Sequence, residues 1–400
     1  MTFSELRLPE PLLKAVTDLG YTAPTQIQMQ SIPLLMQGKD VIGQSQTGSG
    51  KTAAFGIPML CKLSPNRGLQ GLILTPTREL CLQVSDALRG FSKYMPFKIV
   101  AVFGGVGIGP QINASRSADV IVATPGRLLD LMNRGLKLGG VKYLVLDEAD
   151  RMLDMGFIDD VERIIQQIPK QRQTVLFSAT LSPRLQTLVK KHMNMPSTIQ
   201  TKLQVDKTLL VERAYQVEPN DKLSLLVHLI KSETAGIAVV FCKTRHGCDK
   251  VAKRLKSQKI DAIAIHGGLA QNQRTRAIDT LHAQGEGVLV ATDVASRGLH
   301  IDNISHVYNY DIPQTPDDYV HRIGRTARAG AKGDAVTFVS SQDVRDFREI
   351  LRTVKREVPF TILPKFEKII IPYTPNDRPF HKPAQGSNAR RPFWKNKRRN

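Results

Sequence analysis

Residues 147 to 150 read Asp147-Glu148-Ala149-Asp150 and directly follow the apolar run Val141-Lys142-Tyr143-Leu144-Val145-Leu146. A β-rich run that ends in paired carboxylates brings them to the carboxyl edge of a parallel sheet, where open α/β folds bind ligands. Upstream lies a phosphate-binding loop, Ser45-Gln46-Thr47-Gly48-Ser49-Gly50-Lys51-Thr52. Together they predict an enzyme that uses a nucleoside triphosphate, with Mg²⁺ and an attacking water held at the carboxylates.

The size and charge of the chain suggest two domains and a polyanionic partner. The sequence has 400 residues, with 56 Lys and Arg against 36 Asp and Glu, a net charge of +20. This surplus favours nucleic acid or an anionic membrane surface as the partner. No continuous apolar stretch of about 20 residues is present, and the start lacks the features of a secretory signal. We therefore expect no membrane span and a cytoplasmic protein.

The four cysteines do not indicate a disulfide framework or a zinc site. They are Cys61, Cys81, Cys242 and Cys248, and no two form a CxxC pair. We expect reduced, partly buried thiols.

Short apolar runs alternate with helical stretches in two successive series, which predicts two parallel α/β domains with helices on both faces of each sheet. The runs of the first series are Gly71–Leu74, Lys98–Phe103, Val120–Ala123, Tyr143–Leu146 and Thr174–Phe177. Those of the second are Ala238–Phe241, Ala262–Ile265, Gly287–Ala291 and His306–Tyr310.

The segment from Gln200 to Val211 is polar, without a helical stripe, and is predicted to link the two domains across a cleft. We expect the first domain over residues 1–205 and the second over 206–370. Residues 371–400 form a basic tail, in which all charged residues from Arg378 onward are basic and surround Phe393 and Trp394. Such a composition predicts disorder.

The phosphate-binding loop carries a specific chemistry. Its backbone N–H groups turn toward phosphates at a helix start, Lys51 reaches the β- and γ-phosphates, and the Thr52 hydroxyl binds Mg²⁺. Ser45 stands where the general pattern has Gly. Asp147 is expected to hold Mg²⁺, and Glu148 to orient and deprotonate water. The acids could instead cap a helix N-terminus, but the presence of the phosphate-binding loop favours the catalytic role.

The segment His321-Arg322-Ile323-Gly324-Arg325-Thr326-Ala327-Arg328 brings several cations together. On a helix, Arg325 and Arg328 would share one side and approach the γ-phosphate as arginine fingers. A solvated basic helix face is an alternative of about equal weight.

These residues occur with Ser178-Ala179-Thr180, Pro76-Thr77-Arg78-Glu79-Leu80 and Thr124-Pro125-Gly126-Arg127. In order and spacing the motifs closely resemble those of the DEAD-box ATP-dependent RNA helicases, from about Phe3 to Ala335. The resemblance implies two tandem RecA-like domains, an RNA-dependent ATPase, ATP and Mg²⁺ as cofactors, and catalytic roles for Asp150, Ser178, Thr180 and His321. The hydroxyls of Ser178 and Thr180 would bond with the acidic motif and link nucleotide state to RNA binding.

The resemblance also implies which residues bind the adenine nucleotide. Gln28 would hydrogen-bond adenine, with Phe3 stacking on the base and Tyr21 nearby. Ser45, Gln46, Thr47, Gly48, Ser49, Gly50, Lys51 and Thr52 would surround the phosphates. Family members commonly have Ala in place of Ser45, and Asp in place of His300, where it contacts the ribose. Either His300 or Asp302 could supply that contact.

The same resemblance implies RNA contacts with little sequence specificity, because they are made to the backbone. They fall on Pro76, Thr77, Arg78, Gly104, Gly105, Thr124, Pro125, Gly126 and Arg127 in the first domain. In the second domain they fall on Thr244, Arg274 and Thr292, within or beside Phe241-Cys242-Lys243-Thr244, Gln271 and Ala291-Thr292-Asp293.

Three functions remain open at this point. The first is an ATPase that separates short RNA duplexes or remodels RNA–protein complexes, and the second is an ATP-gated RNA clamp. A translocating DNA helicase is disfavoured by Asp150 and by the segment Gly20 to Gln28. We expect a monomer with RNA and ribonucleoprotein partners, while the target RNA and its pathway are not specified.

Overall fold

The computed structural model describes residues 2–6, 8–45, 49–200, 209–234, 236–269, 271–293, 304–327 and 332–369, without the side chains of Gln271, Asn272 and Thr275. Several positions named above lie outside these residues. They are Gln46, Thr47, Gly48, His300, Asp302, Arg328 and the basic tail.

The first half of the chain forms a parallel sheet with seven strands among the described residues, in the order β3-β4-β2-β5-β6-β1-β7. The strands are β1 (Val41–Gln44), β2 (Gly71–Leu74), β3 (Ile99–Val102), β4 (Val120–Ala123), β5 (Tyr143–Leu146), β6 (Gln173–Ser178) and β7 (Ser197–Gln200). Because every pairing is parallel, all carboxyl ends lie at one edge.

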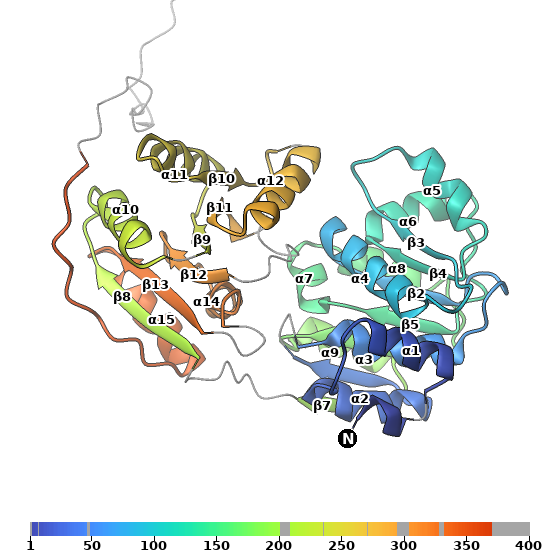
Figure 1. The fold of residues 1–400 in the computed structure, drawn as a ribbon. Helices are drawn as coiled ribbons and strands as arrows, with labels where there is room; N and C mark the ends of the chain where they lie inside the picture. Colours follow the sequence, from blue (N-terminus) through green and yellow to red (C-terminus); the bar gives the residue numbers. More distant parts are fainter. Residues whose placement is uncertain are drawn as a thin grey trace, which may run out of the picture.

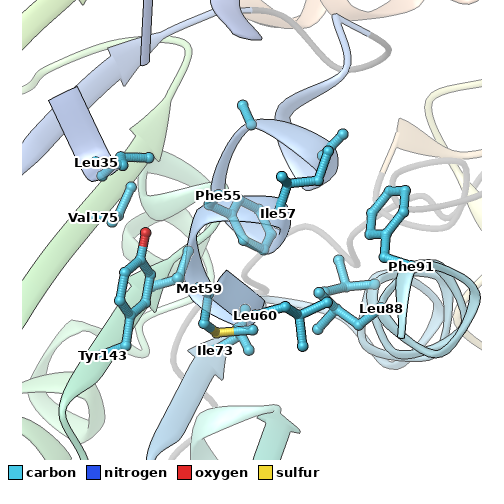
Figure 2. Packing of buried hydrophobic residues seen from close by; sticks show 14 of the residues in the cluster. Leu35, Phe55, Ile57, Met59, Leu60, Ile73, Leu88, Phe91, Tyr143 and Val175 are labelled. Atoms are coloured by element: carbon cyan, nitrogen blue, oxygen red, sulfur yellow. The ribbon is translucent and has the colours of Figure 1, made fainter. Parts of the chain in front are cut away.

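Helices cover both faces of this sheet (Figure 1). They are α1 (Glu10–Asp18), α2 (Gln26–Met36), α3 (Lys51–Lys62), α4 (Arg78–Phe91), α5 (Ile108–Ser115), α6 (Pro125–Met132), α7 (Ala149–Asp154), α8 (Ile158–Ile165) and α9 (Pro183–His192), after the 3₁₀ turn η1 (Phe3–Leu6). One apolar cluster packs on each face. Figure 2 shows Phe55 and Leu60 of α3 in the first cluster, with Phe91 of α4 and Tyr143 of β5. Burial of these side chains fixes α3 against the sheet.

The second half forms a parallel sheet with six strands in the described part of the chain, in the order β10-β11-β9-β12-β13-β8. The strands are β8 (Leu210–Gln216), β9 (Ile237–Phe241), β10 (Ala262–Ile265), β11 (Gly287–Ala291), β12 (Ile304–Asn309) and β13 (Gly333–Val339). The helices are α10 (Lys222–Glu233), α11 (Arg245–Ser257), α12 (Gln271–Gln284), α14 (Pro316–Ile323) and α15 (Val344–Val354). An apolar cluster again lies on each face.

The predicted fold class, two α/β domains with parallel sheets, is confirmed, and each predicted run lies on a strand. The sequence prediction missed β1, β7, β8 and β13. β7 and β8 are edge strands with exposed positions, so they lack the continuous apolar character of a buried strand.

The predicted linker was too long at both ends. Gln200 belongs to β7, and Leu210 and Val211 belong to β8. The four cysteines are free thiols, as expected. Among the described helices, none is long and apolar enough to cross a lipid bilayer.

Gly43 of β1 permits the close approach of Phe177 on the neighbouring strand β6. A Cβ atom at position 43 would lie 2.1 Å from Cε1 of the buried Phe177 ring. We predict that Gly43→Ala lowers the free energy of unfolding of the first domain by about 1–3 kcal/mol, the usual cost of overpacking. Urea unfolding measures the change.

Gly139→Ala is the matched control, because a Cβ atom there would meet nothing within 4 Å. Equal stability of the Gly43→Ala variant and the wild type would show that Phe177 can move aside at no cost.

Candidate active site and nucleic-acid interface

The phosphate-binding loop runs from the end of β1 to the start of α3. Gly50 precedes α3 with φ 88°, in the left-handed region that favours glycine. Lys51 is buried, and its Nζ donates to the Ser45 carbonyl over 3.5 Å, while Ser49 Oγ donates to Ser45 Oγ over 3.1 Å. Thr52 follows in the first turn of α3. The free N–H groups of such a helix start form an anion-binding site.

Gln28, the predicted adenine contact, holds this loop from α2. Its Oε1 accepts from Thr25 N–H at 2.9 Å, and its Nε2 donates to the Gly50 carbonyl at 3.0 Å. The Thr25 hydroxyl also donates to the Ser49 carbonyl at 2.8 Å. A primary amide has a second lone pair and a second N–H, so these bonds leave capacity for a base.

Sequence reasoning missed Thr25, although Thr25-Gln26-Ile27-Gln28 has the pattern of a capping box. That pattern was the available signal.

The predicted stacking residue Phe3 lies in the core. Its side chain is 3% exposed and meets Tyr21 edge-on, with ring centroids 6.0 Å apart. Tyr21 in turn meets Phe91 at 5.6 Å. An adenine could stack on Phe3 only by taking the place of a protein neighbour.

Asp147 and Glu148 come directly after β5 and are both buried. Oδ1 of Asp147 has no hydrogen-bond partner among the described residues. Burial raises the pKa of the Asp147 carboxyl to about 6, and the Lys51 charge opposes that rise. Glu148 has φ 52°, ψ 54°, a conformation that non-glycine residues rarely adopt and that is enriched at functional sites.

Asp150 joins the ends of β5 and β6. Its Oδ2 accepts from the backbone N–H of Ala179 at 2.9 Å and of Thr180 at 3.1 Å. Its own N–H donates to Ser178 Oγ at 3.2 Å, and that hydroxyl donates to the Thr180 carbonyl at 2.6 Å. Ser178 therefore takes part through its hydroxyl, as predicted, whereas Thr180 bonds through its backbone.

In the second domain, Arg322 joins the ends of three strands. Its guanidinium forms a bidentate pair with Asp293 at 2.6 and 2.7 Å, and donates to Asn309 Oδ1 and to the Asp311 carbonyl. It also lies 5.0 Å from the centre of the Phe241 ring. Sequence reasoning did not single out Arg322, because the cation run alone does not show which member is buried.

The prediction that Arg325 lies on a helix with Arg328 was wrong. Helix α14 carries His321 and ends at Ile323, and Gly324 is its C-cap. Ala327 then adopts φ 55°, a left-handed conformation with which a right-handed helix cannot continue. Arg325 is buried in the turn that follows the helix.

The predicted RNA contacts of the first domain gather at the carboxyl edge of its sheet. Thr77, shortly after β2, caps α4 through its hydroxyl, and Thr124, directly after β4, is the N-cap residue of α6. Pro76, Pro125 and Gly126 lie beside them, and the exposed Gly104 and Gly105 follow β3.

The two arginines at this edge have protein contacts. Arg127 donates to the Val106 carbonyl at 3.0 Å and to Gln111 Oε1 at 3.4 Å, which fixes the loop after β3. Arg78 lies 4.5 Å from the centre of the Phe103 ring, and burial lowers the pKa of its guanidinium. The two side chains thus shape the edge as well as offering positive charge.

The predicted RNA contacts of the second domain lie at the corresponding edge of its own sheet. The exposed Thr244 caps α11 through its hydroxyl, which accepts from Gly247 N–H at 3.0 Å, and Thr292 follows β11. Arg274 on α12 forms an ion pair at 3.2 Å with Glu79 on α4 of the first domain. The two edges therefore adjoin.

A second electrostatic contact crosses between the domains. Burial lowers the pKa of Arg151 on α7, and the carboxylates of Glu148, Asp150, Asp154 and Asp293 oppose that shift. Asp293 belongs to the second domain, so a charge beyond the end of β11 acts on the arginine that directly follows the acidic motif of the first domain.

The residues after β5 and β1 fit a magnesium ion bound with a nucleotide. A buried carboxylate oxygen without a hydrogen-bond donor, at Asp147, is a hard ligand of the kind Mg²⁺ prefers. No group of three or more His, Cys, Asp or Glu residues that could hold a metal occurs in the described part of the chain. Mg²⁺ commonly binds through one or two carboxylates together with phosphate oxygens.

We predict that Asp147→Asn changes the pH dependence of stability. The folded pKa of Asp147, about 6, lies above its ordinary value of 3.8. The contribution of Asp147 to the free energy of unfolding is therefore fully present below the ordinary pKa and is lost as the pH rises through about 6. Without divalent metal, wild type should lose about 1–3 kcal/mol relative to the variant between about pH 4 and about pH 7.

Urea unfolding of both proteins in a metal chelator at the two pH values measures this difference. A constant difference across the window would mean that Asp147 has an ordinary pKa in the folded protein.

Comparison with known proteins agrees with this geometry. Family models match residues 25–188 (DEAD/DEAH box helicase) and 221–330 (helicase conserved C-terminal domain). The ATP-dependent RNA helicase CshA of Listeria monocytogenes is 44% identical over 360 residues, 89% of this chain and 69% of that protein. The DEAD-box ATP-dependent RNA helicase CshA of Geobacillus kaustophilus is 43% identical over 361 residues, 89% of this chain and 77% of that protein.

Solved structures show the same likeness. S. cerevisiae Dbp5 bound to RNA and ADP BeF3 is 33% identical, with a TM-score of 0.82, covering 90% of this chain and 95% of that one. A DEAD box protein from Methanococcus jannaschii is 40% identical, with a TM-score of 0.56 and coverage of 90% and 99%. By its two family domains and by its identity to these relatives over most of its length, the chain belongs to the DEAD-box ATP-dependent RNA helicases, enzymes that hydrolyse ATP when they act on RNA.

Proposed function

We propose that this helicase hydrolyses Mg²⁺-bound ATP between its two domains and uses the cycle to separate short RNA duplexes or to remodel RNA–protein complexes. The observation that carries the proposal is the buried, unpartnered Oδ1 of Asp147, in the electrostatic field of Lys51 and beside Glu148. A cation bound with nucleotide would satisfy this oxygen, and Glu148, the next residue, would act on the water that attacks the γ-phosphate.

Lys51 and the N–H groups at the start of α3 bind the phosphate oxygens, and Thr52 and Asp147 hold the metal. Mg²⁺, when bound, neutralises charge that develops on the phosphates. Glu148 accepts the proton of the attacking water. The Asp150 bonds to Ala179 and Thr180 fix the strand end on which the acids stand.

The second domain contributes cations from the region of α14. We propose Arg325 and Arg328, with His321, as the groups that stabilise the transition state, an effect worth roughly 10³ to 10⁵ in rate for arginine fingers. Arg322, which is bound to Asp293, instead positions this region. Since the cations and the phosphate loop come from different domains, hydrolysis requires both in place.

RNA binds along the carboxyl edges of the two sheets, which lie next to each other. The starts of α4, α6 and α11 offer N–H groups and threonine hydroxyls, which suit phosphates and carry no base information. The Glu79–Arg274 pair supports a continuous track across both domains. The RNA contact residues predicted above, and the domain boundaries at about 205 and 370, are part of this proposal.

We also propose that the chain acts as a monomer in the cytoplasm. Ribonucleoproteins are its proposed partners, because its family and its charge both support RNA binding. The nucleotide ribose is contacted from His300 or Asp302.

We predict that Glu148→Gln lowers kcat for RNA-stimulated ATP hydrolysis by about 10² to 10⁴, because the amide cannot accept the water proton. ATP and RNA binding should persist, since the side chain keeps its shape. A phosphate-release assay at saturating RNA measures kcat. Asp154→Asn, which removes one exposed carboxylate at the end of the same helix, is the matched control.

Hydrolysis at the wild-type rate by the Glu148→Gln variant would show that another residue is the general base.

A separate measurement decides between unwinding and an ATP-gated clamp. Displacement of a short RNA duplex should accompany ATP turnover, whereas turnover without displacement would favour the clamp.

A further inference from the structure

A basic surface lies on α15, apart from the nucleotide and RNA edges. Arg345, Arg348 and Arg352 follow at spacings of three and four residues, which puts them on one face of α15, and the C-cap Lys355 lines the same hollow as Arg348 and Arg352. All four are exposed. Among the described residues none of the four side chains has an acidic partner. Arg356, by contrast, pairs with Glu212 and is neutralised.

An exposed apolar segment adjoins this face. After α15, the chain from Val358 onward runs along the outer side of the second domain, past β8 and toward α10 (Figure 1). Phe360 is 40% exposed, Leu363 40% and Ile362 91%. The segment is nevertheless fixed, because Ala214 N–H donates to the Pro359 carbonyl at 3.0 Å and Thr361 N–H donates to the Ala214 carbonyl at 2.8 Å.

Beyond this patch the chain stays attached to the domain. Ile369 N–H donates to Ser224 Oγ at 3.1 Å, and Lys368 forms an ion pair with Asp221 at 3.0 Å. The exposed side chains of Ile362 and Leu363 are therefore held in place between two anchored points.

The helix and the segment enclose a groove of about 550 Å³. It is lined by Arg348, Leu351, Arg356, Glu357, Val358, Pro359 and Phe360. An adjoining hollow of about 390 Å³ extends it past Arg352 and Lys355. The groove thus has a partly apolar floor and a basic rim, the arrangement of a protein-binding patch.

The charges of the groove decide among occupants. The chain's own tail is excluded, because from Arg378 to its end it carries only basic charges. RNA would match the arginines but gains little from exposed aliphatic side chains, since base recognition uses aromatic stacking and polar contacts. Leu351 and Val358 in the groove, with the exposed Ile362 and Leu363 that follow in the same segment, therefore favour a protein.

We propose that α15 and residues 358–363 form a docking surface for an acidic, amphipathic helical segment of a partner protein. Carboxylates of the segment pair with Arg348, Arg352 and Lys355, while its apolar residues cover Phe360, Ile362 and Leu363. The docking surface is separate from the proposed catalytic function, so one proposal can be wrong while the other holds.

The test uses the full chain and a fluorescein-labelled synthetic helical peptide with Glu along one face and Leu along the other. Fluorescence polarisation should show saturable binding. The Arg348→Glu, Arg352→Glu double variant should weaken it by about tenfold or more, and the Ile362→Ser, Leu363→Ser double variant by about fivefold or more. RNA-stimulated ATPase activity should be unchanged in both.

Two controls separate the surface from general charge attraction. Arg116→Glu with Arg134→Glu makes the same charge change at exposed sites of the first domain and should leave peptide affinity intact. A peptide of identical composition but shuffled order, without an apolar face, should bind much more weakly. Circular dichroism confirms that each variant is folded.

Several results would overturn the proposal. One is equal binding of the ordered and shuffled peptides, and another is no effect of either double variant on peptide affinity. The third is no binding up to about 1 mM peptide, because a Kd above that value corresponds to a binding free energy weaker than about −4 kcal/mol. Loss of affinity for single-stranded RNA, with peptide binding unchanged, would identify RNA as the occupant instead.

Discussion

The carboxylate of Asp150 is the interaction on which the nucleotide site depends. It accepts from two backbone N–H groups after β6, while its own N–H bonds to Ser178 at the end of that strand. Hydrogen bonds to an ionised carboxylate are roughly twice as strong as neutral ones. These bonds hold the turn after β5 against β6, and so place Asp147 and Glu148 in a buried position where charged groups are otherwise costly.

The phosphate loop is held by a different device. Thr25, the N-cap of α2, and Gln28 in its first turn bond to the backbone carbonyls of Ser49 and Gly50. A Cβ atom at Gly50 would lie 2.3 Å from Gln28 Nε2, so glycine is required both for this approach and for the positive φ. Any movement of Ser49 and Gly50 relative to α2 must therefore change these two bonds.

In the second domain Arg322 plays the part that Asp150 plays in the first. A buried cation there binds Asp293, Asn309 and the Asp311 carbonyl, which lie at or beyond the ends of β11 and β12, the two strands that flank β9. Each domain thus uses a buried charged side chain with several hydrogen bonds to order the loops at the carboxyl edge of its sheet. Between the domains, Glu79 and Arg274 form an ion pair, and Asp293 acts electrostatically on Arg151. Such contacts can be broken and remade in a working cycle more readily than a packed apolar interface.

The sequence by itself determined the two parallel sheets, the phosphate loop and the acidic motif, because continuous apolar runs and Gly-Lys-Thr after a glycine turn are local signals. It did not reveal the edge strands β7 and β8, whose residues are partly exposed, nor the end of α14 before Arg325, which depends on the backbone conformation at Gly324 and Ala327. Only the tertiary structure decided which cation is buried, that Asp147 lacks a hydrogen-bond donor, and that Gln28 reaches Gly50. Each of these depends on side chains that are distant in sequence and meet only when the strand ends are brought together.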